Sequence, residues 1–300
     1  MVSRLRRRTT IGLALSAVVA VVNVAPIASV AAAPSAPQQA VDSGVAAARG
    51  DGVNQYVALV DRSTGDLVAT SGGNTQVISE SIVKLFTVGY YLVKYDGHLP
   101  SGLADDLHEM IVHSDDNLES RYWTTAAVPA MAARYGLSHT SNGPRTGPHD
   151  WGWEYITAND EAKFLYEASK DPVVGPFLTA AMAGVAAVGN DGFDQAFGFN
   201  ALDGDHGSKQ GWTDRNTSAA INIHSVGWTH KYFGAILETS GSPKYDTMRA
   251  DATVTARLID GLKSLAETAA AESSARATAL AGFVAAFNSV IGALHALLPA

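Results

Sequence analysis

Three short motifs hold the residues of this sequence that are best suited to covalent chemistry. They read SIVK at 81–84, SDD at 114–116 and KQG at 209–211. A serine hydroxyl is a weak nucleophile at neutral pH and needs a base within hydrogen-bond distance. A lysine can be that base when burial or a second cation suppresses its charge. On a helix, the spacing of Ser81 and Lys84 puts both side chains on one face, which predicts a serine nucleophile with its proton acceptor.

The segments around these motifs predict the elements that position them. Residues 82–92 are apolar-rich and favour a buried helix with Ser81 at its N-terminus, where the helix dipole favours negative charge. Residues 55–61 and 66–70 flank a turn sequence and predict a β-hairpin. The KQG segment, 208–213, is followed by two further strand candidates at 219–227 and 232–237. Between the first and last motifs the chain is expected to be mainly helical.

The order and setting of the motifs resemble those of the serine β-lactamases, class A above all, and of the penicillin-binding D-alanyl-D-alanine peptidases. The resemblance covers roughly residues 55–265. It implies an α/β fold, in which an antiparallel sheet is flanked by helices and joined to a mainly helical lobe. It also implies that Ser81 attacks an amide carbonyl while Lys84 takes its proton. Ser114 and Lys209 would complete the proton and charge network, and the backbone N–H groups of Ser81 and Trp212 would form the oxyanion hole.

Two motifs depart from the family pattern at positions that contact substrate. Asp116 stands where the family has Asn, and a carboxylate accepts hydrogen bonds but does not donate them unless it is protonated. Either Asp116 takes that place and alters recognition of the acyl group, or a local shift presents Asn117. In the third motif Gln210, before Gly211, stands where the family has Ser or Thr. The replacement candidates for binding a substrate carboxylate are the residues Thr213 and Arg215.

A third departure concerns the group that activates water for deacylation. Class A enzymes use a Glu between the second and third motifs, but residues 136–150 contain none. Glu154 is the nearest candidate, and the alternative is an exposed charge beside an aromatic cluster. Asp150 and His149 are weaker candidates.

Composition excludes several classes of site and partner. The chain has 300 residues and is 47% hydrophobic, so we expect a sizeable core. Its net charge of −8 argues against an extended nucleic-acid surface. It has no cysteine, which rules out disulfides and thiolate zinc sites. The nine histidines show no paired metal-ligand spacing. We therefore expect neither a metal nor a cofactor.

The sequence divides into four predicted segments. Residues 1–33 resemble an export signal, 34–48 a linker, 49–266 the catalytic domain, and 267–300 an Ala-rich helical extension. The protein is therefore expected to be secreted or extracytoplasmic, with the Sec and twin-arginine routes both open. The extension is expected to pack on the domain or on a partner, with weak membrane association as the alternative.

These predictions lead to three functional hypotheses. The first is an exported serine hydrolase that acts through an acyl-enzyme on β-lactams or related amides. The second is a D-alanyl-D-alanine carboxypeptidase that acts on peptidoglycan stem peptides. The third is a catalytically weak or inactive homologue that serves as a cell-wall binding module.

Overall fold

An antiparallel sheet of five strands forms the centre of the computed structural model, which describes residues 33–145, 147, 150–213 and 220–262. The strand order is β2-β1-β7-β6-β5, so both ends of the described chain contribute to one sheet. The strands are β1 (Asn54–Asp61), β2 (Leu67–Ser71), β5 (Gly207–Trp212), β6 (Ile221–Trp228) and β7 (Tyr232–Ser240). The predicted hairpin is β1–β2. The KQG motif lies on β5, which is an edge strand.

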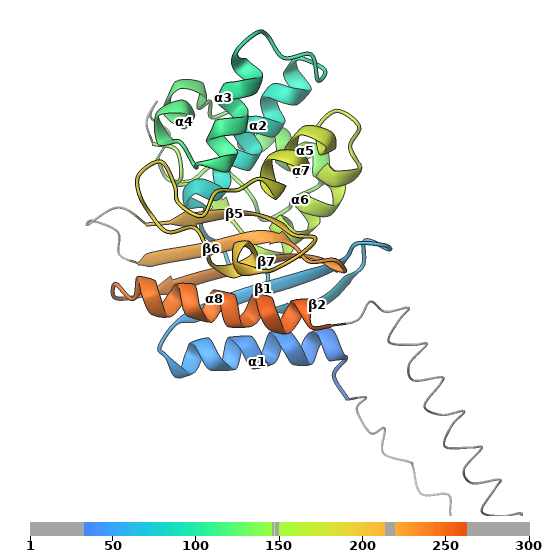
Figure 1. Ribbon diagram of the computed structural model, residues 1–300, viewed down its shortest axis with the longest axis vertical. Coiled ribbons are helices and arrows are strands. Elements are labelled where there is room, and N and C mark those ends of the chain that lie inside the picture. Colours follow the sequence, from blue (N-terminus) through green and yellow to red (C-terminus); the bar gives the residue numbers. More distant parts are fainter. Residues whose placement is uncertain (1–32, 146, 148–149, 214–219, 263–300) are drawn as a thin grey trace, which may run out of the picture. The chain divides into compact units, whose positions relative to one another are not determined.

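Two helices, α1 (Ala36–Gly50) and α8 (Tyr245–Asp260), cover one face of the sheet (Figure 1). The prediction of a linker over residues 34–48 is wrong, because this segment forms most of α1. Ser35 caps the helix, and Val41 and Val45 are buried against the sheet. A Cβ on Gly44 would lie 2.3 Å from Thr255 Oγ1, so the glycine permits close packing on α8. Small residues thus bring α1 and α8 together.

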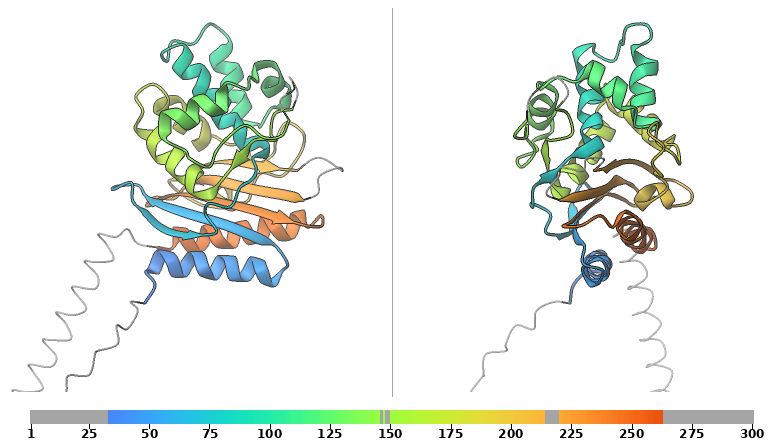
Figure 2. Two further views of the ribbon diagram at one scale, coloured as in Figure 1. Left: turned by 180° about the vertical axis from the view of Figure 1, so that it is seen from behind. Right: turned by 90° about the vertical axis from the view of Figure 1, so that its left-hand side faces the viewer.

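The other face of the sheet carries the helical lobe (Figures 1 and 2). Its helices are α2 (Val83–Lys94), α3 (Leu103–Val112), α4 (Asp116–Tyr122), α5 (Ala127–Tyr135), α6 (Ala158–Lys170) and α7 (Gly175–Ala183). Helix α2 is the apolar helix expected over 82–92 and is buried along most of its length. Phe86 on α2 packs against Phe164 on α6, with ring centroids 4.9 Å apart. The antiparallel sheet, its flanking helices and the helical lobe agree with the predicted fold class.

Short elements connect the sheet to the lobe. Strand β3 (Val77–Ile78) pairs with β4 (Tyr155–Ile156), and 3-10 turns lie at η1 (Glu80–Ile82) and η2 (Gly198–Ala201). The pairing places the segment before Ser81 beside the segment that holds Glu154.

The predicted terminal segments fall almost wholly outside the described residues. These are residues 1–32 of the expected export signal and the whole extension 267–300. Within the described ranges, no helix is long and apolar enough to cross a membrane.

Candidate active site

Ser81 and Lys84 lie in contact where the lobe meets the sheet. Ser81 is in the turn η1, and Lys84 is in the first turn of α2. The Lys84 Nζ atom lies 2.8 Å from Ser81 Oγ. The lysine is fully buried, whereas 6% of Ser81 is exposed. The expected pairing on one face is therefore present, although Ser81 lies in the 3-10 turn just before the α-helix.

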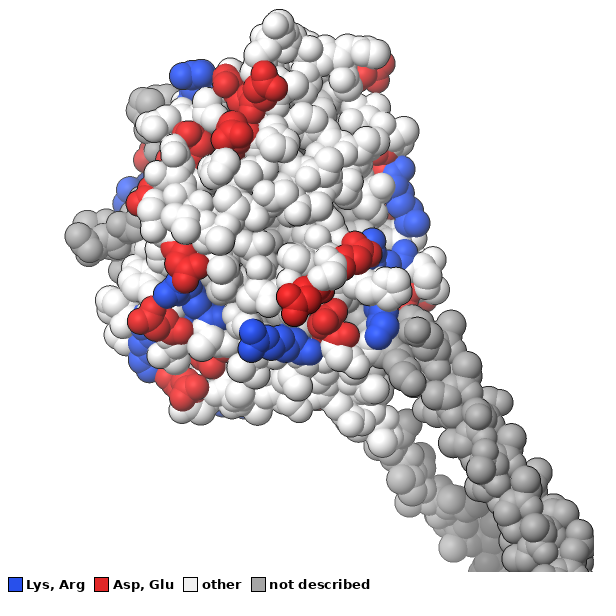
Figure 3. Space-filling model, in the orientation of Figure 1, with Lys and Arg blue, Asp and Glu red and all other residues white. Residues whose placement is uncertain are grey.

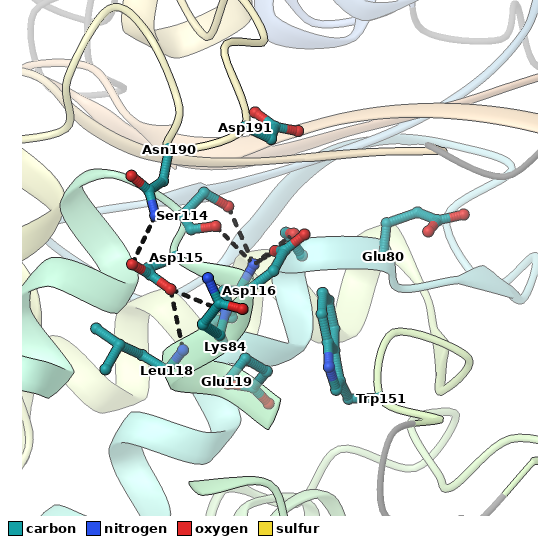
Figure 4. Close-up of polar contacts among 12 residues, drawn as sticks. Glu80, Lys84, Ser114, Asp115, Asp116, Leu118, Glu119, Trp151, Asn190 and Asp191 are labelled. Atoms are coloured by element: carbon teal, nitrogen blue, oxygen red, sulfur yellow. Dashed lines mark hydrogen bonds and ion pairs between the residues drawn. The ribbon is translucent and has the colours of Figure 1, made fainter. Parts of the chain in front are cut away.

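Ser114 lies between the two lysine side chains. Its Oγ atom is 3.2 Å from Lys84 Nζ, and its carbonyl oxygen accepts a bond of 3.0 Å from Lys84 (Figure 4). The same Oγ atom is 2.8 Å from Lys209 Nζ. Ser114 has φ +55°, an uncommon backbone conformation for a residue other than glycine. Asp115 then caps α4. This sharp change of direction turns the Ser114 hydroxyl toward both amines.

Lys209 projects from β5 into the same cluster and is fully buried. Burial lowers the pKa of Lys209 well below its usual value, and the positive charge of Lys84 lowers it further. Its Nζ also donates to the Gln210 carbonyl at 2.8 Å. The site therefore favours an uncharged Lys209 amine, a form that accepts protons.

Asp116, and not Asn117, stands beside the lysines. Its Oδ1 atom lies 2.6 Å from Lys84 Nζ, and 41% of its side chain is exposed. Asn117 is on the surface, and its backbone N–H donates to the Asp115 carboxylate at 2.8 Å. Of the two alternatives left open by the sequence, the structure has a carboxylate at the second-motif position.

Gly211 allows β5 to approach the nucleophile closely. A Cβ at this position would lie 3.2 Å from the Ser81 backbone nitrogen and 3.1 Å from the Ser79 carbonyl oxygen. The strand continues into Trp212, whose indole N–H bonds Asp191 at 3.1 Å and whose ring stacks on Phe193 at 4.5 Å. The backbone of residues 211–212 thus runs beside the Ser81 N–H group, as an oxyanion hole of two backbone donors requires.

The side chains of Gln210 and Thr213 are turned into the protein. Gln210 is fully buried and donates to Ser208 Oγ at 2.9 Å. The Thr213 hydroxyl donates to Glu80 Oε1 at 3.0 Å and accepts the Asn222 N–H at 2.8 Å. Both side chains, which were expected to contact substrate, are thus bonded within the protein. Arg215, the other candidate, lies outside the described residues.

Glu80 is a site residue that sequence reasoning missed. It directly precedes Ser81, has φ +47° and is 2% exposed. Its Oε1 atom accepts bonds from Thr213 and from Asn222 Nδ2, the latter at 2.8 Å. Nearby, His224 Nε2 lies 2.8 Å from the Ile78 carbonyl oxygen, and burial lowers the pKa of His224 to about 4. The sheet therefore holds the turn that carries the nucleophile, through residues that no local sequence motif marks.

Glu119 is a second missed residue and lies on α4 behind Lys84 (Figure 4). It is fully buried, and Thr87 donates to its Oε1 atom at 2.7 Å. Burial raises the pKa of Glu119 to about 7, although Lys84 and Lys209 act in the opposite direction. The sequence signal was only its position three residues after Asp116.

Trp151 covers the lysine from the other side. The Lys84 Nζ atom lies 4.6 Å from the centroid of the Trp151 ring, and the Trp151 indole N–H bonds Ser120 Oγ at 2.9 Å. An aromatic face beside an ammonium group adds cation–π attraction and excludes water.

Glu154 is fully buried, which overturns the alternative of an exposed charge. Burial raises its pKa to about 7. Its backbone carbonyl accepts the Ser79 N–H at 2.8 Å, but its carboxylate forms no hydrogen bond to Ser81 or Lys84. Asp150 accepts the Gly147 N–H at 3.0 Å, and His149 lies outside the described residues. Glu154 is thus held close to the nucleophile turn without contacting the nucleophile.

This protein is similar to known proteins in its fold and not detectably in its sequence. No family model matches the sequence, and no curated protein matches it either. Solved structures do match. A class A β-lactamase representative from Bacteroides cellulosilyticus is 17% identical, with a TM-score of 0.59, over 75% of this chain and 99% of that one. A β-lactamase from Xanthomonas campestris is 14% identical, with a TM-score of 0.60, over 77% and 99% of the two chains.

The fold is that of the class A β-lactamases. A class A β-lactamase from Mycobacterium abscessus matches at a TM-score of 0.54 and 14% identity, over 73% of this chain and 98% of that one. Within this β-lactamase fold, the described residues contain no group of three or more His, Asp or Glu side chains arranged to hold a metal ion.

Proposed function

We propose that this protein is a serine hydrolase that forms an acyl-enzyme at Ser81. One observation carries the proposal: an unbroken series of polar contacts runs from Ser81 Oγ through Lys84 Nζ and Ser114 Oγ to Lys209 Nζ. The successive distances are 2.8, 3.2 and 2.8 Å. Two amines joined by a hydroxyl can take a proton from the nucleophile and return it to a leaving group. The β-lactamase fold adds support by analogy.

The proposed reaction begins when Lys84 passes a proton through Ser114 to the uncharged amine of Lys209. Lys84 takes the proton as Ser81 Oγ attacks the carbonyl carbon, and the Ser81 and Trp212 N–H groups hold the oxyanion. The C–N bond then breaks, and the leaving nitrogen receives a proton through Ser114. Lys209, whose pKa is lowered by burial, shares the transferred proton with Lys84. Water finally cleaves the ester, with Glu154 as the proposed activating group.

The proposed substrates are β-lactams or peptidoglycan stem peptides, and the proposed site of action is outside the cytoplasm. A penicillin-binding peptidase is the second candidate. It is favoured by the Glu154 carboxylate, which makes no hydrogen bond to Ser81 and so supports slow release of an acyl group. The C-terminal extension is proposed to contact the domain, a partner or a membrane surface.

A chromogenic cephalosporin separates these candidates. We would follow colour release and intact mass for the wild type and for Ser81→Ala, both at pH 7. Sustained colour that the substitution abolishes would support a β-lactamase. A stable mass adduct without turnover would support a peptidase. If neither signal appears, the acyl-enzyme proposal fails, and retained binding of cell-wall fragments would then favour a binding module.

A further inference from the structure

The geometry points to Asp116 as the residue that selects the acyl side of the substrate, in favour of groups that carry an amine. This inference rests on the proposed function and adds a substrate class to it. The selected class is amides whose acyl side chain bears a protonated primary amine near the scissile carbonyl.

The position of Asp116 connects it to the reaction centre. Its Oδ1 atom is 2.6 Å from Lys84 Nζ, which is itself 2.8 Å from Ser81 Oγ. Lys84 is fully buried, whereas 41% of the Asp116 side chain is exposed. One end of the carboxylate is therefore bound to the proton-transfer group while the side chain remains open to solvent.

The chemistry of a carboxylate determines which groups can bind there. An ionised carboxylate has acceptor oxygens and no donor, so the carbonyl of a neutral acyl amide finds no hydrogen bond at Asp116. A protonated amine donates up to three N–H bonds and forms charge-assisted hydrogen bonds with carboxylates. The residue thus favours an amine and disfavours a second carbonyl oxygen.

The charges around Asp116 agree with this selection. Within the described ranges, its ion pair with Lys84 is the only one it forms. Glu119 lies behind the same lysine, and burial favours the uncharged form of Lys209. On the face drawn in Figure 3, acidic side chains also gather over α3 and α4. An approaching cation therefore meets one buried positive charge that Asp116 already neutralises.

Among the described residues, the two other side chains expected to bind substrate are held inside the protein. Gln210 and Thr213, the described side chains expected to hold a substrate carboxylate, are buried and bonded to Ser208 and Glu80. The side chain of Asp116, by contrast, is 41% exposed and lies beside the proton-transfer residues.

The test compares two cephalosporins that differ only in an α-amino group, one with a phenylglycyl and one with a phenylacetyl side chain. Intact mass would give the second-order rate constant for acylation of each. The proteins would be the wild type, Asp116→Asn, and Asp105→Asn as a control with the same charge change at an exposed site on α3. Asp116→Asn is expected to slow both compounds because it alters the Lys84 contact. For each protein we would therefore compare the ratio of its rate constants for the two compounds, because a loss that affects both compounds equally cancels in that ratio.

We expect the wild type and Asp105→Asn to prefer the amine compound by roughly tenfold, the scale of one charge-assisted hydrogen bond. Asp116→Asn is expected to lose that preference. A wild-type ratio near one, or a ratio that Asp116→Asn leaves unchanged, would overturn the inference while the acyl-enzyme stands. Absence of both an adduct at Ser81 and hydrolysis of either compound would overturn the acyl-enzyme proposal, and the inference with it.

Discussion

The proton-transfer side of the site (Ser81, Lys84, Ser114 and Lys209) and its recognition side (Asp116, Gln210 and Thr213) differ in how closely they follow the β-lactamase motifs. On the proton-transfer side, the hydroxyls and amines match the motifs in type and meet at 2.8 to 3.2 Å. On the recognition side, Asp116 and Gln210 differ from the motifs, and Gln210 and Thr213 are bonded inside the protein. The comparison teaches that the proposed reaction class and the proposed substrate class are inferred from different residues. The first is supported by geometry that matches the motifs, and the second has to be derived from this chain alone.

The largest expected effect comes from removing the proposed base, Lys84, on the proton-transfer side. Lys84→Met keeps the buried volume of the side chain but removes the base, so acylation of Ser81 should fall by roughly 10²- to 10⁴-fold. Stopped-flow kinetics with a chromogenic cephalosporin would measure the rate constant. Lys94→Met, at the exposed end of the same helix, is the control and should acylate like the wild type. Equal rates for Lys84→Met and the control would show that Lys84 is not the base.

The next effect concerns Glu154, the buried acid held near the nucleophile turn. Burial raises the pKa of Glu154 from 4.5 to about 7 in the folded protein, so the folded state binds its proton more tightly than the unfolded state does. The stability that this provides is complete below pH 4.5 and is lost as the pH rises through 7. Each pKa unit corresponds to about 1.4 kcal/mol, so the loss by pH 8 is roughly 3 kcal/mol.

Glu154→Gln should remove this loss. The free energy of unfolding of the variant should therefore fall less between pH 4.5 and pH 8 than that of the wild type. Urea unfolding at the two pH values would measure the difference, with Asp105→Asn as an exposed control. An identical pH dependence in Glu154→Gln and the wild type would contradict a buried, protonated Glu154.

The smallest expected effect concerns Thr213 on the recognition side, and it tests whether this residue stabilises the fold or binds substrate. Thr213→Val removes a hydroxyl donor to buried Glu80 Oε1 and should lower the free energy of unfolding by about 1 to 3 kcal/mol. If Thr213 instead bound substrate, the substitution would raise KM and leave stability nearly unchanged. Thermal unfolding and steady-state kinetics on the same preparation distinguish these outcomes, and Thr125→Val, at an exposed position, provides a control with the same change in side chain.

Local sequence patterns predicted the fold better than they predicted the site. The β1–β2 hairpin and the helix α2 follow from turn chemistry and an apolar run, which act over a few residues. Helix α1 was missed because its Ala-rich face owes its order to packing on α8, about 200 residues away in the sequence. A segment whose apolar face consists mainly of small residues resembles a linker until its packing partner is known.

In the site, too, contacts between neighbouring residues were predictable, whereas contacts between distant residues were not. Ser81 and Lys84 are close in sequence, so their spacing alone predicted contact. The contact of Glu80 with Asn222 spans 142 positions, and that of Glu119 with Thr87 spans 32. No motif records such pairings, because they arise only when elements far apart in the sequence pack together.

The most direct test of the central claim is to locate the acyl group. The protein would be incubated with benzylpenicillin at pH 7, digested, and its peptides sequenced by tandem mass spectrometry. We predict one adduct per chain, on the hydroxyl of Ser81 and absent from Ser81→Ala. An adduct on another residue, or neither an adduct nor hydrolysis of the penicillin at any concentration tested, would contradict a nucleophile activated by the buried pair of lysines.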